Sequence, residues 1–119
     1  MKPGRKGIAR ILYATLYSMQ GLKAAWQHEA AFRQEVMLSV ILISLTFFLP
    51  VNQLEQLFMI GTLVLVVIVE LLNSAVEAVV DRIGSEWSEL SGRAKDIGSA
   101  SVLIALLFAL FTWLYILLW

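Results

Sequence analysis

VELLNSAVEAVVD, residues 69–81, places four polar side chains within an otherwise apolar run. At intervals of three, four and four residues, these side chains are Glu70, Asn73, Glu77 and Asp81. An α-helix turns about 100° per residue, so all four project from one side, and Glu70 lies roughly 10 Å from Glu77 along the axis. Carboxylates are costly in hydrocarbon and are usually functional there. We call this set the polar stripe, and it predicts a functional site on a membrane helix.

The composition of the chain is that of an integral membrane protein. Hydrophobic residues make up 60% of its 119 residues, against about 45–50% in soluble domains, and the mean hydropathy is +0.81. The length predicts a single domain, residues 1–119. A formal net charge of zero gives no indication of nucleic-acid binding. The absence of cysteine excludes disulfides, thiolate catalysis and cysteine-based metal sites.

The N-terminal part of the chain has the pattern of an amphipathic helix. Apolar residues recur at helical spacing from Ile8 to Trp26, whereas Arg10 and Gln20 fall mostly on the other side. We therefore predict a basic tail over 1–7 and a surface helix over 8–28 that lies in the membrane interface. A helix packed on protein outside the membrane is the alternative.

Three stretches, 30–49, 54–80 and 99–119, are predicted to span the membrane. The apolar run 36–49 is shorter than the ~18 residues usual for a span, so the first helix has to begin near Ala30. Residues 82–98 are polar and rich in Gly and Ser, which predicts a loop whose charged residues are mostly solvated. The fold class is an all-α membrane protein with three transmembrane helices and a surface helix.

The basic residues give the orientation of these spans. All nine Lys and Arg residues lie either before the apolar run 36–49 or between the second and the third span. By the positive-inside rule that side is cytoplasmic. The N-terminus is therefore expected in the cytoplasm and the C-terminus on the far side, with Glu77 near cytosolic nucleotide and Glu70 deeper.

Further charged side chains are expected at the membrane level of the polar stripe. Glu29 and Glu35, around the start of the first span, add oxygen ligands to those of the stripe. Mg²⁺ prefers one or two protein carboxylates together with water and phosphate oxygens, and Lys95 and Arg10 are suited to phosphate. The structural alternative is hydrogen bonding between helices, or pairing of the glutamates with basic residues. No P-loop or kinase catalytic-loop motif occurs.

Three segments, AAWQHEAAFRQE (24–35), IVELLNSAVEAVVDRIGSE (68–86) and ELSGRAKDIGSASVLIA (89–105), resemble the prokaryotic integral-membrane diacylglycerol kinases. The resemblance covers about residues 8–113, and the E-x-x-N-x-x-x-E block is its specific part. It implies a homotrimer of the bacterial inner membrane, with composite active sites and a periplasmic C-terminus. The implied activity is transfer of the γ-phosphate of ATP, with Mg²⁺, to the hydroxyl of diacylglycerol, giving phosphatidate.

The resemblance also implies roles for individual residues. Glu70 resembles the proton acceptor for the lipid hydroxyl, with Asn73 in the catalytic site, and Glu29 and Glu77 resemble the Mg²⁺ ligands. The residues that match nucleotide-binding positions are Arg10, Tyr17, Glu29, Glu77, Glu86, Trp87, Ser88, Lys95 and Asp96. The residues that match the lipid pocket are Arg10, Ala31, Phe32, Arg33, Gln34, Glu35, Glu70, Ser99 and Trp113.

Two pairs depart from the family pattern. Trp87-Ser88 stands in place of a Tyr-His pair in the loop over the nucleoside, and Met19-Gln20 in place of Trp-Lys in the surface helix. The acceptor is expected to be diacylglycerol, with undecaprenol as the alternative. From the residues alone, a proton-coupled transporter that uses Glu70 and an assembly subunit are also open.

Overall fold

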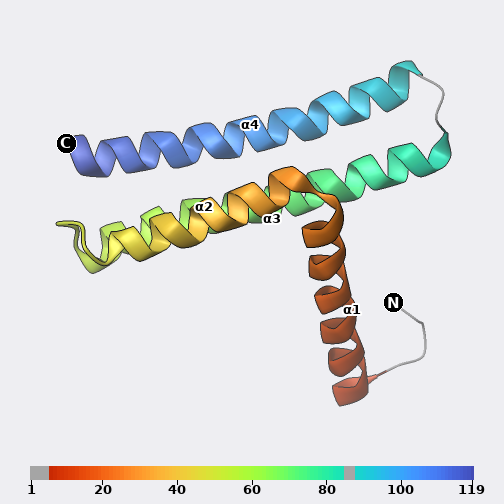
Figure 1. The fold of residues 1–119 in the computed structure, drawn as a ribbon, viewed down its shortest axis with the longest axis horizontal. Coiled ribbons are helices and arrows are strands. Elements are labelled where there is room, and N and C mark those ends of the chain that lie inside the picture. The colour runs from red at the N-terminus through yellow and green to blue at the C-terminus, as the bar shows by residue number, and fades with distance from the viewer. Residues whose placement is uncertain (1–5, 85–87) are drawn as a thin grey trace.

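The computed structural model describes residues 6–84 and 88–119, and these residues form four helices and no strand. The helices are α1 (Gly7–His28), α2 (Ala30–Thr46), α3 (Gln53–Ile83) and α4 (Glu89–Leu118). Figure 1 shows α2, α3 and α4 running along one common direction, whereas α1 projects from them at a steep angle. The all-α class predicted from the sequence is confirmed.

The corner between α1 and α2 is fixed by one basic side chain. Glu29 adopts an extended backbone conformation, with φ −118° and ψ 102°, which ends α1 and lets the chain change direction. Arg33 Nη1 donates hydrogen bonds to the carbonyl oxygens of Trp26, at 2.7 Å, and Gln27, at 3.3 Å. Because the last carbonyls of a helix have no partner within it and carry partial negative charge, the guanidinium stabilises the end of α1.

The turn between α2 and α3 is held by polar side chains. α2 ends at Thr46, before the predicted span end at residue 49. Phe47 N and Phe48 N bond to carbonyls only three residues back, which tightens the last turn. Steric clash with Pro50 also disfavours helical geometry at Leu49. Asn52 and Glu55 form a capping box, in which Glu55 N donates to Asn52 Oδ1 at 2.8 Å and Asn52 N to Glu55 Oε1 at 3.0 Å. Gln56 Nε2 then donates to Thr46 Oγ1 at 3.0 Å, which ties the two helices together.

α3 and α4 pack against each other through small residues and one indole. Ala105 and Ala109 on α4 are buried against Val66 on α3, and their short side chains allow the helices to approach closely. Further along, Trp113 Nε1 donates a hydrogen bond to the Met59 carbonyl oxygen at 3.1 Å. A single antiparallel register therefore extends along α3 and α4.

The loop predicted over 82–98 is wrong in extent. α3 continues to Ile83 and α4 begins at Glu89, so only residues 84–88 connect them, and 85–87 lie outside the described residues. Ser88 caps α4, with its hydroxyl accepting a hydrogen bond from Ser91 N at 3.0 Å. Polarity suggested a loop, but Glu, Arg, Lys and Ala are good helix formers, and a capped helix carries them on an exposed surface.

The four helices leave an unusually large apolar surface. The accessible surface is 9064 Å², whereas a compact soluble monomer of 13.3 kDa exposes about 6,500 Å². Among the described residues, α3 and α4 are long and apolar enough to cross a membrane, and most of their surface is not covered by the chain. α2, with 17 residues, is below that length. These features are those of a helical membrane protein.

Candidate functional site

The polar stripe runs along α3 from a buried end to an exposed end. Glu70 is 6% exposed and Asn73 is 9% exposed, Glu77 is half-buried and Asp81 is exposed. Asn73 Nδ2 donates a hydrogen bond to Glu77 Oε1 at 3.1 Å. The i, i+4 spacing brings these two side chains together, as expected on one helical face.

Four glutamates gather around the buried end of the stripe. The carboxyl groups of Glu35 on α2 and Glu70 on α3 lie side by side, and Glu29 and Glu77 are near enough to Glu70 to act on it electrostatically. Glu35 Oε2 is buried and makes no hydrogen bond within the described part of the chain. The structure thus brings together acidic residues from the α1–α2 corner, from α2 and from α3.

A cation closes the exposed end of the stripe. Lys95 Nζ on α4 forms an ion pair with Asp81 Oδ1 at 2.8 Å. The hydrogen bond to Asp81 raises the pKa of Lys95, with a further contribution from Glu77, so the ammonium is charged at neutral pH. Asp81, the last member of the polar stripe, remains exposed while it makes this contact. The sequence did not predict this contact, because its partner lies on another helix.

An apolar pocket of about 240 Å³ lies between α2, α3 and α4. Its wall includes Leu42, Leu63, Leu106 and Trp113, and Glu35 supplies a carboxyl group. Apolar pockets with few polar groups are typical of sites for apolar ligands.

The other residues predicted to contact lipid have different surroundings. Phe32 is buried, whereas Ala31, Gln34 and Ser99 are exposed. Arg33 is engaged with the end of α1.

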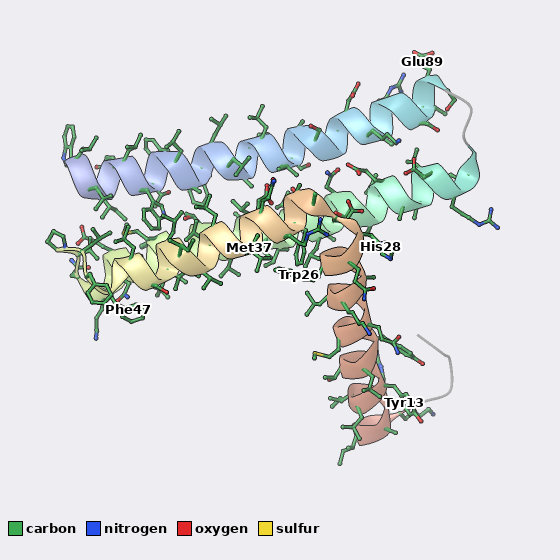
Figure 2. The ribbon with its side chains drawn as sticks, in the orientation of Figure 1. Tyr13, Trp26, His28, Met37, Phe47 and Glu89 are labelled. Carbon is green, nitrogen blue, oxygen red and sulfur yellow. The ribbon has the colours of Figure 1, made fainter. Side chains whose placement is uncertain are left out.

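A second hollow, of about 690 Å³, lies in the corner between α1 and α3. Ser18, His28 and Glu29 line it from one side, and Ser74 and Ala78 line it from the other. Figure 2 shows Trp26 and His28 where α1 meets the other helices. This hollow is larger and more polar than the apolar pocket, and it has Glu29 on its wall.

The N-terminal half of α1 lies apart from the polar stripe. Figure 2 shows Tyr13 far out on α1, away from the other three helices. Arg10 and Tyr17 flank Tyr13 on the same helix, and the rings of Tyr13 and Tyr17 are 6.3 Å apart. Arg10 precedes Tyr13 on this outlying part of α1, so within one chain it lies apart from the glutamates.

The remaining predicted nucleotide residues are at the start of α4 or just before it. Asp96 is exposed on α4, and Ser88 caps that helix. Glu86 and Trp87 lie outside the described residues. Among the residues that the structure describes, no group of three or more acidic or histidine side chains is arranged to hold a metal ion. A metal bound by two carboxylates and by phosphate oxygens requires no such group.

Comparison with known proteins assigns the chain to a family. The family model for prokaryotic diacylglycerol kinase matches residues 16–117. A diacylglycerol kinase of Escherichia coli (strain K12) is 55% identical over 113 residues, 95% of this chain and 92% of that protein. The diacylglycerol kinase of Haemophilus influenzae is 56% identical over 90% of this chain and 91% of that protein. That of Pseudomonas aeruginosa is 51% identical over 97% of this chain and 94% of that protein. The chain belongs to the prokaryotic diacylglycerol kinase family.

Proposed function

We propose that the chain is a membrane diacylglycerol kinase that transfers the γ-phosphate of ATP to the lipid hydroxyl, giving phosphatidate. Membership of the family, at 51–56% identity to the three curated kinases above, supports the reaction. The observation that supports the mechanism is the polar stripe. Its buried end has the carboxylate of Glu70, next to Glu35 of the apolar pocket, and its exposed end has the ammonium of Lys95.

Glu70 is the proton acceptor in this proposal. The hydroxyl oxygen of the lipid attacks the γ-phosphorus, its proton passes to a Glu70 oxygen, and the bond from phosphorus to the bridging oxygen of ATP breaks to release ADP. Glu70 is 6% exposed, which excludes water that would compete with the lipid for phosphate. The lipid pocket residues, among them Glu35 and Trp113 of the 240 Å³ pocket, hold the acyl part.

The exposed end of the polar stripe is suited to the phosphates of ATP, the phosphate donor. Glu77, oriented by Asn73, and Glu29 would hold Mg²⁺, which neutralises phosphate charge when bound. Two carboxylates fit an ion that takes its other ligands from water and phosphate. Lys95 supplies a positive charge to phosphate oxygens. The other proposed nucleotide contacts are Arg10 and Tyr17 of the surface helix, residues 86–88 and Asp96. Phosphoryl transfer needs chiefly positioning and charge neutralisation, so this set is sufficient.

The proposed assembly is a homotrimer with composite active sites. Its support is the large apolar surface, together with the position of Arg10, which precedes the outlying Tyr13 on α1 and is therefore far from the polar stripe within one chain. A neighbouring copy would bring its own α1 to the stripe. Each copy has three spans in this proposal, with α2 and the turn that follows it forming the first. The N-terminus is placed in the cytoplasm and the C-terminus in the periplasm of the inner membrane.

The test is phosphate transfer from radiolabelled ATP in mixed micelles that contain diacylglycerol, ceramide or undecaprenol. The proposal predicts Mg²⁺-dependent label in phosphatidate and little in the other two lipids. Preferential labelling of undecaprenol would overturn the acceptor, and proton-driven flux in vesicles without ATP turnover would overturn the kinase.

A further inference from the structure

Gly98 on α4 lies directly against Asn73 on α3, in the middle of the polar stripe. A Cβ atom added to Gly98 would lie 3.3 Å from Asn73 Cγ and would overlap Asn73 Oδ1. A Cβ atom added to Gly61, also inside a long helix, would meet no atom within 4 Å. The missing side chain of Gly98 therefore leaves the space that the Asn73 carboxamide occupies.

The orientation of that carboxamide is set from both sides. Asn73 Nδ2 donates to Glu77 Oε1, and a carboxylate accepts hydrogen bonds but does not donate them. The amide nitrogen therefore faces Glu77, and the oxygen is directed towards Gly98. Asn73 Oδ1 is buried and has no hydrogen-bond partner within the described part of the chain. An unpaired buried carbonyl is unfavourable, and it fits at this place only because Gly98 has no side chain.

This contact also relates two groups that lie on different helices. Lys95 is one turn before Gly98 on α4, and Glu77 is one turn after Asn73 on α3. Lys95 and Glu77 are near enough to attract each other. Any change in the distance between α3 and α4 at Gly98 would therefore change the distance between the ammonium and the carboxylate.

We propose that Gly98 is a positioning residue of the MgATP site, because its lack of a side chain lets the Asn73 carboxamide lie between α3 and α4 and hold Glu77 opposite Lys95. The kinetic consequence rests on the proposed function. The packing consequence does not, so the two are tested separately. A side chain at Gly98 moves Asn73 off Glu77, moves α4 off α3, or does both.

The experiment compares Gly98→Ala with the matched control Gly61→Ala, each purified as the full chain in detergent. Both changes replace a helical glycine by the best helix former, so intrinsic propensity favours both. Two quantities are measured: the thermal unfolding midpoint, and kcat and KM for MgATP at saturating diacylglycerol. Asn73→Ala and the double variant Asn73→Ala/Gly98→Ala complete a thermodynamic cycle for the midpoint.

Gly98→Ala is expected to raise KM for MgATP and lower kcat, together reducing kcat/KM by about tenfold or more, because small displacements in a transfer site are costly. It lowers the midpoint by roughly 4 °C in the wild-type background, and in the Asn73→Ala background it leaves the midpoint unchanged or raises it through helix propensity. Gly61→Ala leaves both kinetic constants unchanged. If Gly98→Ala alone does not fold, recovery of folded protein in the double variant supports the same contact.

Two results would overturn the proposal. The first is a KM for MgATP that stays at the wild-type value in Gly98→Ala, since a merely structural role reduces folded enzyme and not nucleotide affinity. The second is an equal fall of the midpoint in both backgrounds, which would mean that Asn73 is not what the new side chain meets. Absence of phosphate transfer in the wild type would refute the proposed function. The thermal midpoints of the four proteins in the cycle would still show whether Gly98 packs against Asn73.

Discussion

Lys95 and Asp81 connect α4 to α3 by an ion pair with 2.8 Å between Nζ and Oδ1. Lys95 is the residue proposed to meet ATP phosphates, so its present partner competes with the nucleotide. Both side chains are substantially exposed, at 47% and 68%, and exposed ion pairs are weak and screened by salt. The pair can therefore open when phosphate arrives.

Asp81→Asn tests that competition. Removing the carboxylate frees Lys95, and we expect KM for MgATP to fall by about two- to fivefold, the range of a weak exposed pair, with kcat unchanged. Glu89→Gln is the control, because it removes the exposed Glu89–Arg93 pair within α4 and is expected to leave KM unchanged. A higher KM in Asp81→Asn would show instead that Asp81 holds Lys95 in its working position.

Asn73→Ala tests the support of the proposed metal ligand. Asn73 Nδ2 donates to Glu77 Oε1, and loss of a partner that orients a metal ligand typically costs about 10–100-fold in metal affinity or activity. We expect the free Mg²⁺ concentration for half-maximal rate to rise by that factor. Ser101→Ala is the control, since the Ser101 hydroxyl bonds only to the Ile97 carbonyl of its own helix among the described contacts. An unchanged Mg²⁺ requirement in Asn73→Ala would argue against Glu77 as a ligand.

Trp113→Phe tests the wall of the apolar pocket. The substitution keeps an aromatic ring but removes the indole N–H that donates to the Met59 carbonyl. We expect a loss of about 1 kcal/mol in the free energy of unfolding, the usual net value of such a bond, measured by denaturation in detergent. Because Trp113 lines the 240 Å³ pocket, KM for diacylglycerol should rise while KM for MgATP stays constant. Equal changes in both KM values would show that Trp113 does not act through the lipid.

The spacing of residues within one helix was enough to predict the polar stripe. Glu70, Asn73 and Glu77 share a face in any α-helix, and the deeper position expected for Glu70 agrees with its burial, whereas Glu77 is only half-buried. The sequence also predicted that α2 begins near Ala30, because the apolar run 36–49 alone is too short for a span.

Contacts between helices could not be predicted in the same way. The pairing of Lys95 with Asp81, and the packing of Gly98 on Asn73, depend on the register of α4 against α3. Small residues such as Ala105 and the bond from Trp113 to Met59 define that register. The first part of α4 was missed because its polarity was interpreted as a loop, although polar residues also form exposed helices.

The most direct measurement of the central claim is the rate of phosphate transfer to diacylglycerol by Glu70→Gln, with nucleotide binding measured on the same protein. Glutamine keeps the shape of the side chain but cannot take the proton of the lipid hydroxyl. Loss of a general base typically lowers the rate by about 10²–10⁴-fold, and we predict that fall in kcat with the dissociation constant for MgATP unchanged. A Glu70→Gln enzyme that retains near wild-type kcat would contradict the account.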